Sequence, residues 1–419
     1  MGVGPREILA AGVTLARGHL ARYGGSGTSS TTRFERELAE HTGAKHVLAV
    51  NSGTSALTCG LVGLGVGPGD EVLVPAYTFV ASPASVLGAG AVPVTVDIDA
   101  SLMMDPDDVR RKITERTKAI MPVHMLNLVC DMDSLMSIAD EFGLVVVEDA
   151  AQAAGARYKG RAVGTIGHAG AFSFNQQKNL KSGEGGALLT DDARVYTRAA
   201  MFHDVGNYMR GVESVSEEPL FAGYNLRMSE LTSSVLRPQL ARLDRLMATR
   251  RRRTLYVLDA LDRRTDVVPV PHNDPDNAVG VAIRCSSAEQ AKRLQELRGV
   301  FRLLDTGRHV HTNWEPVLVR RSHHPSIDPW AWAYGSADAA PSVDCANVID
   351  ILARTCAITI DPEIPGPLFR RMVSNLRDAV EGLDRTAGVP PSGSERVARD
   401  TEDVSPASPD PSDAPSAAS

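Results

Sequence analysis

A lysine and a carboxylate that follow two strand-like segments are the residues of this sequence best suited to chemistry. Lys178 lies in GAFSFNQQKNLKSGEGG, residues 170–186, where an apolar run leads into a polar loop and a glycine turn. Asp149 and Gln152 follow a second apolar run, LVVV at residues 144–147. Because carboxylates usually remain in water, an acid directly after such a run favours a cationic partner, although Asp149 could equally cap a helix. These residues predict an amine nucleophile near a carboxylate.

A candidate anion site follows a third apolar run. In VLAVNSGTSAL a strand pattern ends and a helix begins, so the backbone N–H groups and hydroxyls of Gly53, Thr54 and Ser55 would face a ligand at the helix end. A phosphate carries about −1.5 to −2 charges and a helix terminus offers only about +0.5, so further donors are needed, and Ser173 can supply one. A lysine, an acid and an anion site are what pyridoxal 5′-phosphate (PLP) requires. The amine forms a Schiff base, the acid keeps the pyridine nitrogen protonated, and the helix end binds the phosphate.

Short apolar runs alternate with helical patterns between residues 45 and 190, and they must position these side chains. The runs are KHVLAV, EVLVPA, AVPVTVDI, AIMPVH, LVVVED, GAFSF and GALLT. Runs with so little alternation are typical of strands buried on both faces, and the repeated strand–helix order predicts an α/β doubly wound sheet. Ligands of such sheets bind at the carboxyl ends of the strands, where the lysine, the acid and the anion site would meet.

The rest of the chain predicts a second domain and a tail. Ser229 suits the N-cap of a helix that runs past Pro238, where a kink is expected. We expect residues 1–247 to form a large cofactor-binding domain and residues 248–386 a small α/β domain. Residues 387–419 are rich in Pro, Ser, Asp and Ala and are expected to form a disordered tail, because they have too few apolar side chains to offset the entropy of ordering.

Composition narrows the partners and the compartment. The 419 residues are 43% hydrophobic and 23% charged with a formal net charge of −7, and no apolar run reaches the ~20 residues of a membrane span. Aromatic residues are only 5%, so the arginine run at residues 250–253 is interpreted as a solvated helix face at a domain junction rather than a nucleic-acid patch. Five cysteines without a CxxC motif and the lack of a signal-peptide pattern favour a reducing cytoplasm. We expect small-molecule substrates, no nucleic acid and no membrane.

Other chemistries lack their motifs in this sequence. There is no P-loop pattern, and GEGG follows Lys178 rather than opening a helix as a dinucleotide-binding GxGxxG would, which disfavours a nicotinamide-dependent oxidoreductase. His309, His311, His323 and His324 have no Cys, Asp or Glu at ligand spacing. We therefore expect no metal site, and structural or surface roles for these histidines.

Six segments of the sequence resemble the DegT/StrS-type family of PLP-dependent sugar aminotransferases, also called the DegT/DnrJ group. They are FERELAEHTGAKHVLAVNSGTSAL, GPGDEVLVPAYTFVAS, AVPVTVDID, VVEDAAQAAGA, FSFNQQKNLKSGEGG and GYNLRMSE, in the order and spacing of that family. The likeness runs from about Gly18 to Asp361, and the segments are highly specific when taken together. The resemblance implies a PLP-dependent transferase of fold type I, like aspartate aminotransferase. Such a protein has a mainly parallel seven-stranded sheet, a smaller C-terminal α/β domain and a homodimer that shares its active sites.

The resemblance also implies a role for each candidate residue. Lys178 matches the Schiff-base lysine, Asp149 the acid paired with the pyridine nitrogen, and Gln152 the side chain near the phenolic oxygen of the cofactor. Phe79 matches the aromatic residue that stacks on the cofactor ring, and Tyr77 is a further candidate beside it. The residues that match phosphate contacts are Gly53, Thr54, Ser55 and Ser173, with Asn225 donated by the other subunit.

The activity implied is that of an aminotransferase working in two half-reactions. L-Glutamate or L-glutamine would donate the amino group and a keto-sugar or keto-cyclitol would accept it, in the biosynthesis of amino sugars, aminocyclitols or antibiotics. A PLP-dependent sugar dehydratase is the alternative, but it would have a histidine in place of Lys178. A non-catalytic regulatory relative would have no chemical need for the complete set of site residues.

The sequence departs from the family in two segments, of which DTGRHVHTNWEPVL, residues 305–318, is only a loose match to the segment that contacts acceptors in relatives. Many relatives read PVHLYGxPADMD where this chain reads PVHMLNLVCDMD, so Leu126, Asn127 and Val129 are expected to alter the pocket wall. Asparagine tolerates the left-handed backbone better than most residues, so the turn formed by the replaced glycine can be kept.

Overall fold

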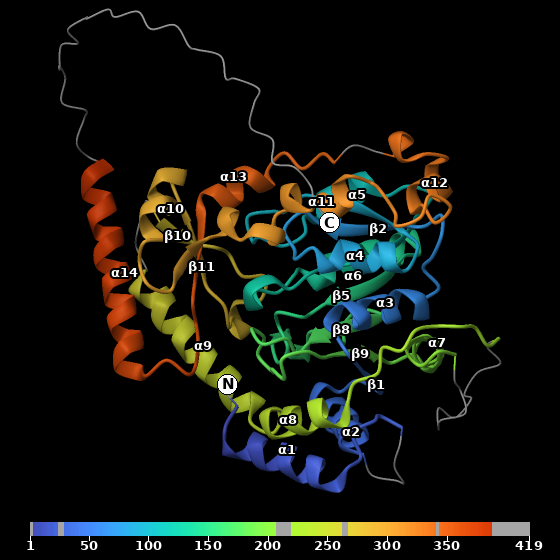
Figure 1. Cartoon of the computed structure of the whole chain (residues 1–419). Helices are drawn as coiled ribbons and strands as arrows, with labels where there is room; N and C mark the ends of the chain where they lie inside the picture. Colours follow the sequence, from blue (N-terminus) through green and yellow to red (C-terminus); the bar gives the residue numbers. More distant parts are fainter. Residues whose placement is uncertain (1–2, 24–28, 207–218, 262–266, 341–342, 388–419) are drawn as a thin grey trace, which may run out of the picture.

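The computed structural model describes residues 3–23, 29–206, 219–261, 267–340 and 343–387, and its largest element is a seven-stranded sheet (Figure 1). The strands lie in the order β1-β9-β8-β5-β4-β2-β3. Their bounds are His46–Val50 (β1), Glu71–Pro75 (β2), Val92–Val96 (β3), Thr117–Ile120 (β4), Val145–Asp149 (β5), Ala169–Ser173 (β8) and Gly186–Thr190 (β9). Strands β3, β2, β4, β5 and β8 pair in parallel, whereas β9 pairs antiparallel with both β1 and β8. The predicted mainly parallel α/β sheet is confirmed.

Helices cover both faces of this sheet. One face carries α3 (Gly53–Gly63), α4 (Ala81–Gly88) and α7 (Ala193–His203), and the other carries α2 (Ser30–Thr42), α5 (Pro106–Lys112), α6 (Met132–Phe142) and α8 (Glu230–Leu240). Val146 belongs to the core under α6, whereas its neighbour Val147 belongs to the core under α3. Successive strand residues point to opposite faces, so a strand buried on both faces must be apolar throughout. This explains the continuous apolar runs of the sequence.

A smaller antiparallel sheet lies beside the large one. Its strands are β10 (Val267–Pro269), β11 (Ala282–Cys285), β12 (Val300–Arg302) and β13 (Thr355–Ile358), in the order β10-β11-β13-β12. Helices α9 (Leu243–Ala260), α10 (Ala288–Leu294) and α14 (Gly366–Ala387) pack on it (Figure 1). Together these elements bury a separate core that includes Val257, Ile283 and Leu376.

The chain passes between the two sheets through α8 and α9. Ser229 caps α8, as predicted, by accepting a hydrogen bond from the Thr232 N–H at 3.2 Å. Pro238 lies in the last turn of α8, and the helix ends at Leu240 before α9 begins. Helix α9 runs through residue 247, so the predicted domain boundary falls within it and stays a prediction. The predicted tail lies outside the described residues from 388 onward, and residue 387 ends α14.

The segment between β12 and β13 returns to the large sheet. It contains short 3-10 turns (Leu303–Asp305, Gly307–His309, His311–Asn313 and Ala337–Ala339) and the helices α11 (Glu315–Leu318), α12 (Pro329–Tyr334) and α13 (Val348–Ala353). Val310 forms a β-bridge with Tyr77, and Trp330 packs with Val92 of β3. This segment, which joins two strands of the small sheet, therefore also packs against the large domain.

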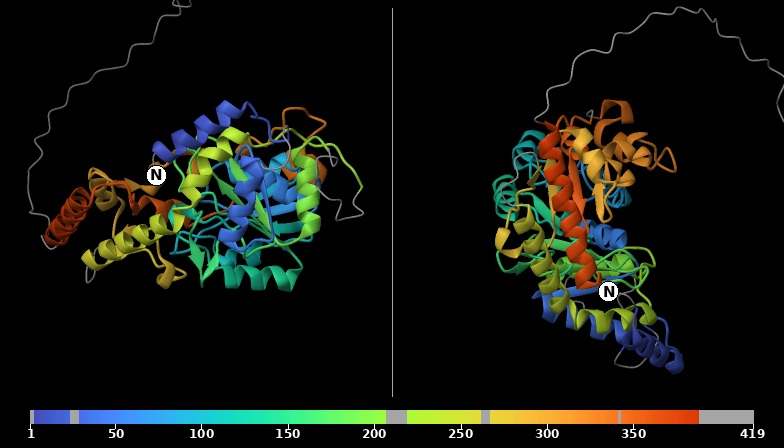
Figure 2. Two further views of the ribbon diagram at one scale, coloured as in Figure 1. Left: turned by 90° about the horizontal axis from the view of Figure 1, so that it is seen from below. Right: turned by 90° about the vertical axis from the view of Figure 1, so that its left-hand side faces the viewer.

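The remaining elements lie at the periphery. Helix α1 (Pro5–Arg17) runs along α8, as Figure 2 shows. The short elements are the hairpin β6 (Arg157–Tyr158) and β7 (Arg161–Ala162) and the 3-10 turns η1 (Met125–Asn127) and Pro275–Asn277. Within the described ranges, none of the helices combines the length and apolarity needed to cross a membrane.

Candidate active site

A cavity of about 260 Å³ lies at the carboxyl ends of β5 and β8, beside the N-terminus of α3. The predicted site residues that line it are Gly53, Thr54, Phe79, Asp149, Gln152, Ser173 and Lys178. These residues come from four separate segments of the sequence. The structure therefore brings them together at the sheet edge expected for a doubly wound fold.

The N-terminus of α3 forms one end of this cavity. The Ser52 hydroxyl caps the helix by accepting a hydrogen bond from the Ser55 N–H at 3.0 Å, while Gly53 and Thr54 line the cavity. The first N–H groups of a helix have no intrahelical acceptor, so this end can bind an anion. A Cβ atom on residue 53 would lie only 2.7 Å from the Ser173 Cβ. Glycine is therefore needed for the helix end to stand this close to Ser173.

Asp149 is the buried acid of the cavity, with 5% of its surface exposed. Its Oδ2 accepts a hydrogen bond from the Ser82 hydroxyl at 2.7 Å, and its Oδ1 accepts one from the Ala151 N–H at 3.1 Å. The hydroxyl of Thr78 lies 2.7 Å from that of Ser82 and completes the chain. Ser82 carries no predicted role, although the AYTFVAS motif contains it.

Lys178 follows β8 in a turn in which its N–H donates to the Asn175 carbonyl at 3.0 Å. The side chain is half-buried and lines the cavity with Asp149. Burial lowers the pKa of the Lys178 ammonium group below its ordinary value of 10.5, and the charge of Asp149 partly offsets this shift. A lysine with a lowered pKa presents more of its neutral, nucleophilic amine at neutral pH.

A second cavity of about 310 Å³ adjoins the first. The residues that line both are Gln152, Gln177, Lys178 and His309. Its far wall comes from α9, the small sheet and the loop after β13, and it includes Arg250, Phe301 and Asp361. The prediction that residues 250–253 form a solvated helix face is wrong for two of the four arginines. Arg250 faces a cavity, and Arg253 donates hydrogen bonds to the backbone carbonyls of the loop after β13.

The 3-10 turn η1 forms another part of this second wall. Leu126 and Asn127 adopt left-handed backbone with φ of 58° and 62°. The Leu126 N–H donates to Gln152 Oε1 at 3.1 Å, and Asn179 Nδ2 donates to Asn127 Oδ1 at 2.7 Å. The expectation that asparagine keeps this turn is confirmed. Leu126 and Asn127 line the cavity, whereas Val129 is buried in the core and does not line either described cavity.

His309 lies where the two cavities meet, although its sequence context predicts only a structural or surface role. Its ring centroid is 5.1 Å from that of Phe79. Phe79 lies on the open side of the cavity and is 41% exposed. His309 Nδ1 lies 2.9 Å from the Thr306 carbonyl, and an N–H donated there leaves Nε2 as an acceptor. Burial lowers the pKa of His309, with a smaller contribution from the charge of Lys178. The β-bridge of the adjacent residue to Tyr77 brings His309 here, and no local motif indicates it.

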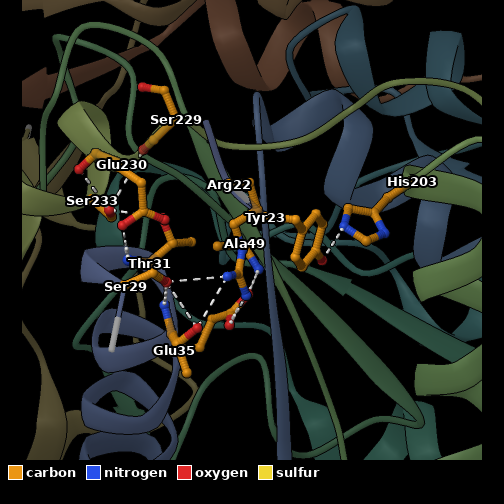
Figure 3. Close-up of polar contacts among 11 residues, drawn as sticks. Arg22, Tyr23, Ser29, Thr31, Glu35, Ala49, His203, Ser229, Glu230 and Ser233 are labelled. Atoms are coloured by element: carbon orange, nitrogen blue, oxygen red, sulfur yellow. Dashed lines mark hydrogen bonds and ion pairs between the residues drawn. The ribbon is translucent and has the colours of Figure 1, made fainter. Parts of the chain in front are cut away.

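A buried polar cluster supports the strand that leads into α3 (Figure 3). Arg22 Nη2 and Glu35 Oε2 form an ion pair of 2.6 Å, and Glu35 Oε1 accepts a hydrogen bond from the Ala49 N–H at 2.9 Å. The Thr31 N–H lies 3.3 Å from Glu230 Oε2, which ties α2 to α8. The cluster therefore fixes the end of β1, from which the helix cap and the anion site continue.

Two predicted site residues lie outside both described cavities. The Ser55 hydroxyl donates to Asn51 Oδ1 at 2.7 Å instead. Asn225 is exposed, and its Oδ1 accepts a hydrogen bond from Arg227 Nε at 2.8 Å. The Leu226 carbonyl accepts from the Asn51 N–H at 2.8 Å, so this segment is fixed beside β1. The phosphate contacts of Ser55 and Asn225 stay predictions. In the part of the chain that the structure describes, no group of three or more His, Cys, Asp or Glu side chains is arranged to hold a metal ion.

Comparison with known proteins identifies the family. The model of the DegT/DnrJ/EryC1/StrS aminotransferase family matches residues 17–311. The chain belongs to this family. It is 43% identical to 3-amino-5-hydroxybenzoate synthase from Amycolatopsis mediterranei over 61% of this chain and 65% of that protein. It is 42% identical to L-glutamine:2-deoxy-scyllo-inosose aminotransferase from Streptomyces lividus over 58% of each. The matches therefore span less than two thirds of the length of these two relatives.

A solved structure extends the likeness over most of the chain. The crystal structure of 3-amino-5-hydroxybenzoic acid synthase is similar to this one with a TM-score of 0.73 and 31% identity, covering 91% of this chain and 97% of that one. Together with the seven-stranded sheet and the smaller antiparallel sheet, this confirms the predicted fold of the PLP-dependent transferases of fold type I.

Proposed function

We propose that this chain is a PLP-dependent aminotransferase that moves an amino group from L-glutamate or L-glutamine to a keto-sugar or keto-cyclitol. The observation that carries the proposal is the joint placement of Lys178 and Asp149 in one cavity that ends at the N-terminus of α3. Membership of an aminotransferase family supports it.

The residues of the first cavity fit PLP at each of its functional groups. The N–H groups of Gly53 and Thr54 and the hydroxyl of Ser173 suit the phosphate. Asp149, whose side-chain oxygens already accept two hydrogen bonds, suits the protonated ring nitrogen. Lys178 supplies an amine for the aldehyde. Phe79 and Gln152 are proposed to contact the ring face and the phenolic oxygen, as they do in the family pattern.

Bound PLP supplies an electron sink for the negative charge that develops on the carbon bearing the amino group. Asp149 would keep that sink effective by holding the ring nitrogen protonated. Lys178, as a neutral amine, would carry a proton from the Cα of the donor to the C4′ carbon of the cofactor and would carry it back to the acceptor carbon in the second half-reaction. Its lowered pKa suits this role, because the amine must be neutral to accept a proton.

We further propose a homodimer, in which the exposed Asn225 of each copy reaches the phosphate end of the other copy's cavity. The name of L-glutamine:2-deoxy-scyllo-inosose aminotransferase pairs a glutamine donor with an inosose, which supports glutamine and a keto-cyclitol as substrates here. A cytoplasmic enzyme of secondary metabolism is part of the same proposal.

An absorption spectrum of the purified chain tests the proposal. We expect a visible band from bound PLP, which L-glutamate or L-glutamine removes and a keto-sugar or keto-cyclitol acceptor restores. Lys178→Ala should abolish both the band and the transfer. Lys181→Ala is the matched control, because Lys181 is close in sequence, lines neither described cavity and places its Nζ 3.9 Å from Glu363. A colourless protein that cannot take up added PLP would overturn the proposal.

A further inference from the structure

Two buried asparagines in the wall of the second cavity are joined through their side-chain amides. Asn179 follows Lys178 directly in the sequence, and Asn127 belongs to the left-handed turn η1. Both line the second cavity, and each is 8% exposed. Asn179 Nδ2 donates to Asn127 Oδ1 at 2.7 Å and to the Ala154 carbonyl at 2.9 Å. The pair therefore connects the turn that departs from the family pattern to the residue next to Lys178.

The contacts of the pair fix which amide atoms are nitrogen and which are oxygen. A carbonyl oxygen can only accept hydrogen bonds, so the Asn179 atom that faces Ala154 must be the nitrogen. The Asn127 atom that this nitrogen also reaches must then be the oxygen. The atoms left over are a donor, Asn127 Nδ2, and an acceptor, Asn179 Oδ1.

These two remaining atoms are open to the cavity. Neither has a hydrogen-bond partner among the described residues, and neither is sealed from solvent. Because both residues line the second cavity, neighbouring amides present one donor and one acceptor there. A ligand group that pairs with both atoms must itself be able to accept and to donate a hydrogen bond.

The surroundings of the two amides favour a neutral ligand group. Apart from each other, their side chains contact the Ala154 carbonyl and, at 3.9 Å, the Met247 sulfur. A carboxylate has only acceptor atoms, so one of its oxygens would face Asn179 Oδ1 with no proton between them. A carboxamide has both functions, on two atoms of one plane, whereas a hydroxyl must supply both from a single oxygen. Two separate amide atoms are therefore matched best by a carboxamide.

We propose that Asn127 and Asn179 bind the side-chain carboxamide of L-glutamine and so select it over L-glutamate as the amino donor, an inference that rests on the function proposed above. The carboxamide oxygen accepts from Asn127 Nδ2, and the carboxamide nitrogen donates to Asn179 Oδ1. A donor held in this way lies in the cavity that Lys178 also lines. A glycine at position 127, as in the family pattern, would leave only the Asn179 half of the pair.

Half-reaction kinetics of Asn127→Gly test this assignment. The loss of the visible PLP band is followed at increasing L-glutamine and L-glutamate. The wild-type protein should reach half-saturation at a lower concentration of L-glutamine than of L-glutamate. In the variant this preference should fall ~3- to 10-fold, because one hydrogen bond to a neutral group is lost. Glycine suits the φ of 62° at this position, so the turn itself is kept.

Lys159→Gly is the matched control. Lys159 is also left-handed, with a φ of 49°, but it is exposed and lines neither described cavity. Replacing it by glycine relaxes the backbone in the same way without touching the two amides. This variant should keep the wild-type preference for L-glutamine.

Equilibrium binding gives a readout that does not depend on turnover. Glutaramate and glutarate are glutamine and glutamate without the amino group, so neither can react. In calorimetry the PLP-loaded wild-type protein should bind glutaramate more tightly than glutarate, and Asn127→Gly should lose ~3- to 10-fold of this preference. The wild-type comparison decides by itself if the variant does not fold.

The possible outcomes separate this assignment from the proposed function. Equal half-saturation by both donors in the wild type, or an unchanged preference in Asn127→Gly, would overturn the assignment. If the variant changed only the half-saturating concentration of a ketone acceptor, the amides would serve an acceptor hydroxyl and the assignment would also be wrong. A wild-type protein without a PLP band would instead overturn the proposed function.

Discussion

A methyl group added at residue 53 should damage the anion site in a way that can be calculated. In Gly53→Ala the new Cβ would lie 2.7 Å from the Ser173 Cβ, 3.2 Å from its Oγ and 3.3 Å from its Cα. The contact cannot be relieved by a rotation, because two of these three atoms belong to or adjoin the backbone of β8. Residue 53 begins α3 and Ser173 pairs with Gly186 inside the sheet, so the helix must move away from the strand.

Two quantities should therefore change together. Overpacking of this kind lowers the free energy of unfolding by about 1–3 kcal/mol. Displacing the helix end weakens at least one hydrogen bond to the phosphate, and a hydrogen bond to a charged group contributes about 1.5–3 kcal/mol. The affinity for PLP should then fall by about 10- to 100-fold, since 1.36 kcal/mol corresponds to a factor of ten.

Titration of the apoprotein with PLP and urea unfolding measure these two quantities. Gly12→Ala is the control, because Gly12 is exposed in α1 and its Cβ would meet nothing within 4 Å. That substitution should raise the free energy of unfolding by about 0.5–1 kcal/mol and leave PLP affinity unchanged. Wild-type PLP affinity in Gly53→Ala would refute the placement of the phosphate at the end of α3.

Two further predictions concern pH. Only the neutral Lys178 amine can condense with an aldehyde. The rate of PLP uptake by the apoprotein should therefore rise with pH, with a midpoint at a Lys178 pKa below 10.5. Asp149→Asn should move this midpoint to lower pH, because it removes the charge that raises the Lys178 pKa. An unchanged midpoint in stopped-flow absorbance would count against the coupling. Burial also lowers the pKa of His203, which lies 3.0 Å from the Tyr23 hydroxyl, from 6.5 to about 4. The unfolded chain therefore binds a proton at a pH where the folded chain does not, so the free energy of unfolding should fall by about 2 kcal/mol between pH 7 and pH 5. In His203→Gln this contribution should disappear from urea titrations, and an equal slope in both proteins would contradict it.

The first cavity could be predicted from the sequence because the segments that line it are short and local. Asp149 is the last residue of β5, and Lys178 and Gly53 follow the ends of β8 and β1 within five residues. Once the strands are recognised as parallel and buried, their carboxyl ends must meet at one edge. Ser82 was within reach of the same reasoning, since it lies in a recognised motif and donates to Asp149 at 2.7 Å. Ser55 shows the limit of motifs, because its hydroxyl bonds to Asn51 instead of lining the cavity.

The second cavity could not be predicted, because it is assembled from contacts between distant segments. The four consecutive arginines cannot be distinguished in the sequence. Only the packing of α9 against the large domain decides that Arg250 faces the cavity. His309 depends on the return of a long segment to Tyr77, which neither periodicity nor a local motif indicates. A lone histidine in a polar segment is rightly interpreted as a surface residue until such a contact is known.

Lys178 lines both cavities, and the predicted cofactor-binding residues Gly53, Asp149 and Ser173 line only the first. This arrangement explains why the reaction type is easier to infer than the acceptor. The chemistry of PLP needs a lysine, an acid and an anion site in fixed relation, and short loops on a rigid sheet supply them. The second wall is built from η1, α9, the small sheet and the segment that carries His309. These elements lie outside the large sheet, and η1 departs from the family pattern at Leu126 and Asn127 while the seven-stranded sheet is kept. A relative can therefore keep the reaction while the shape of the second cavity selects another acceptor, so the acceptor must be sought by fitting ketones to that wall rather than to the cofactor motif.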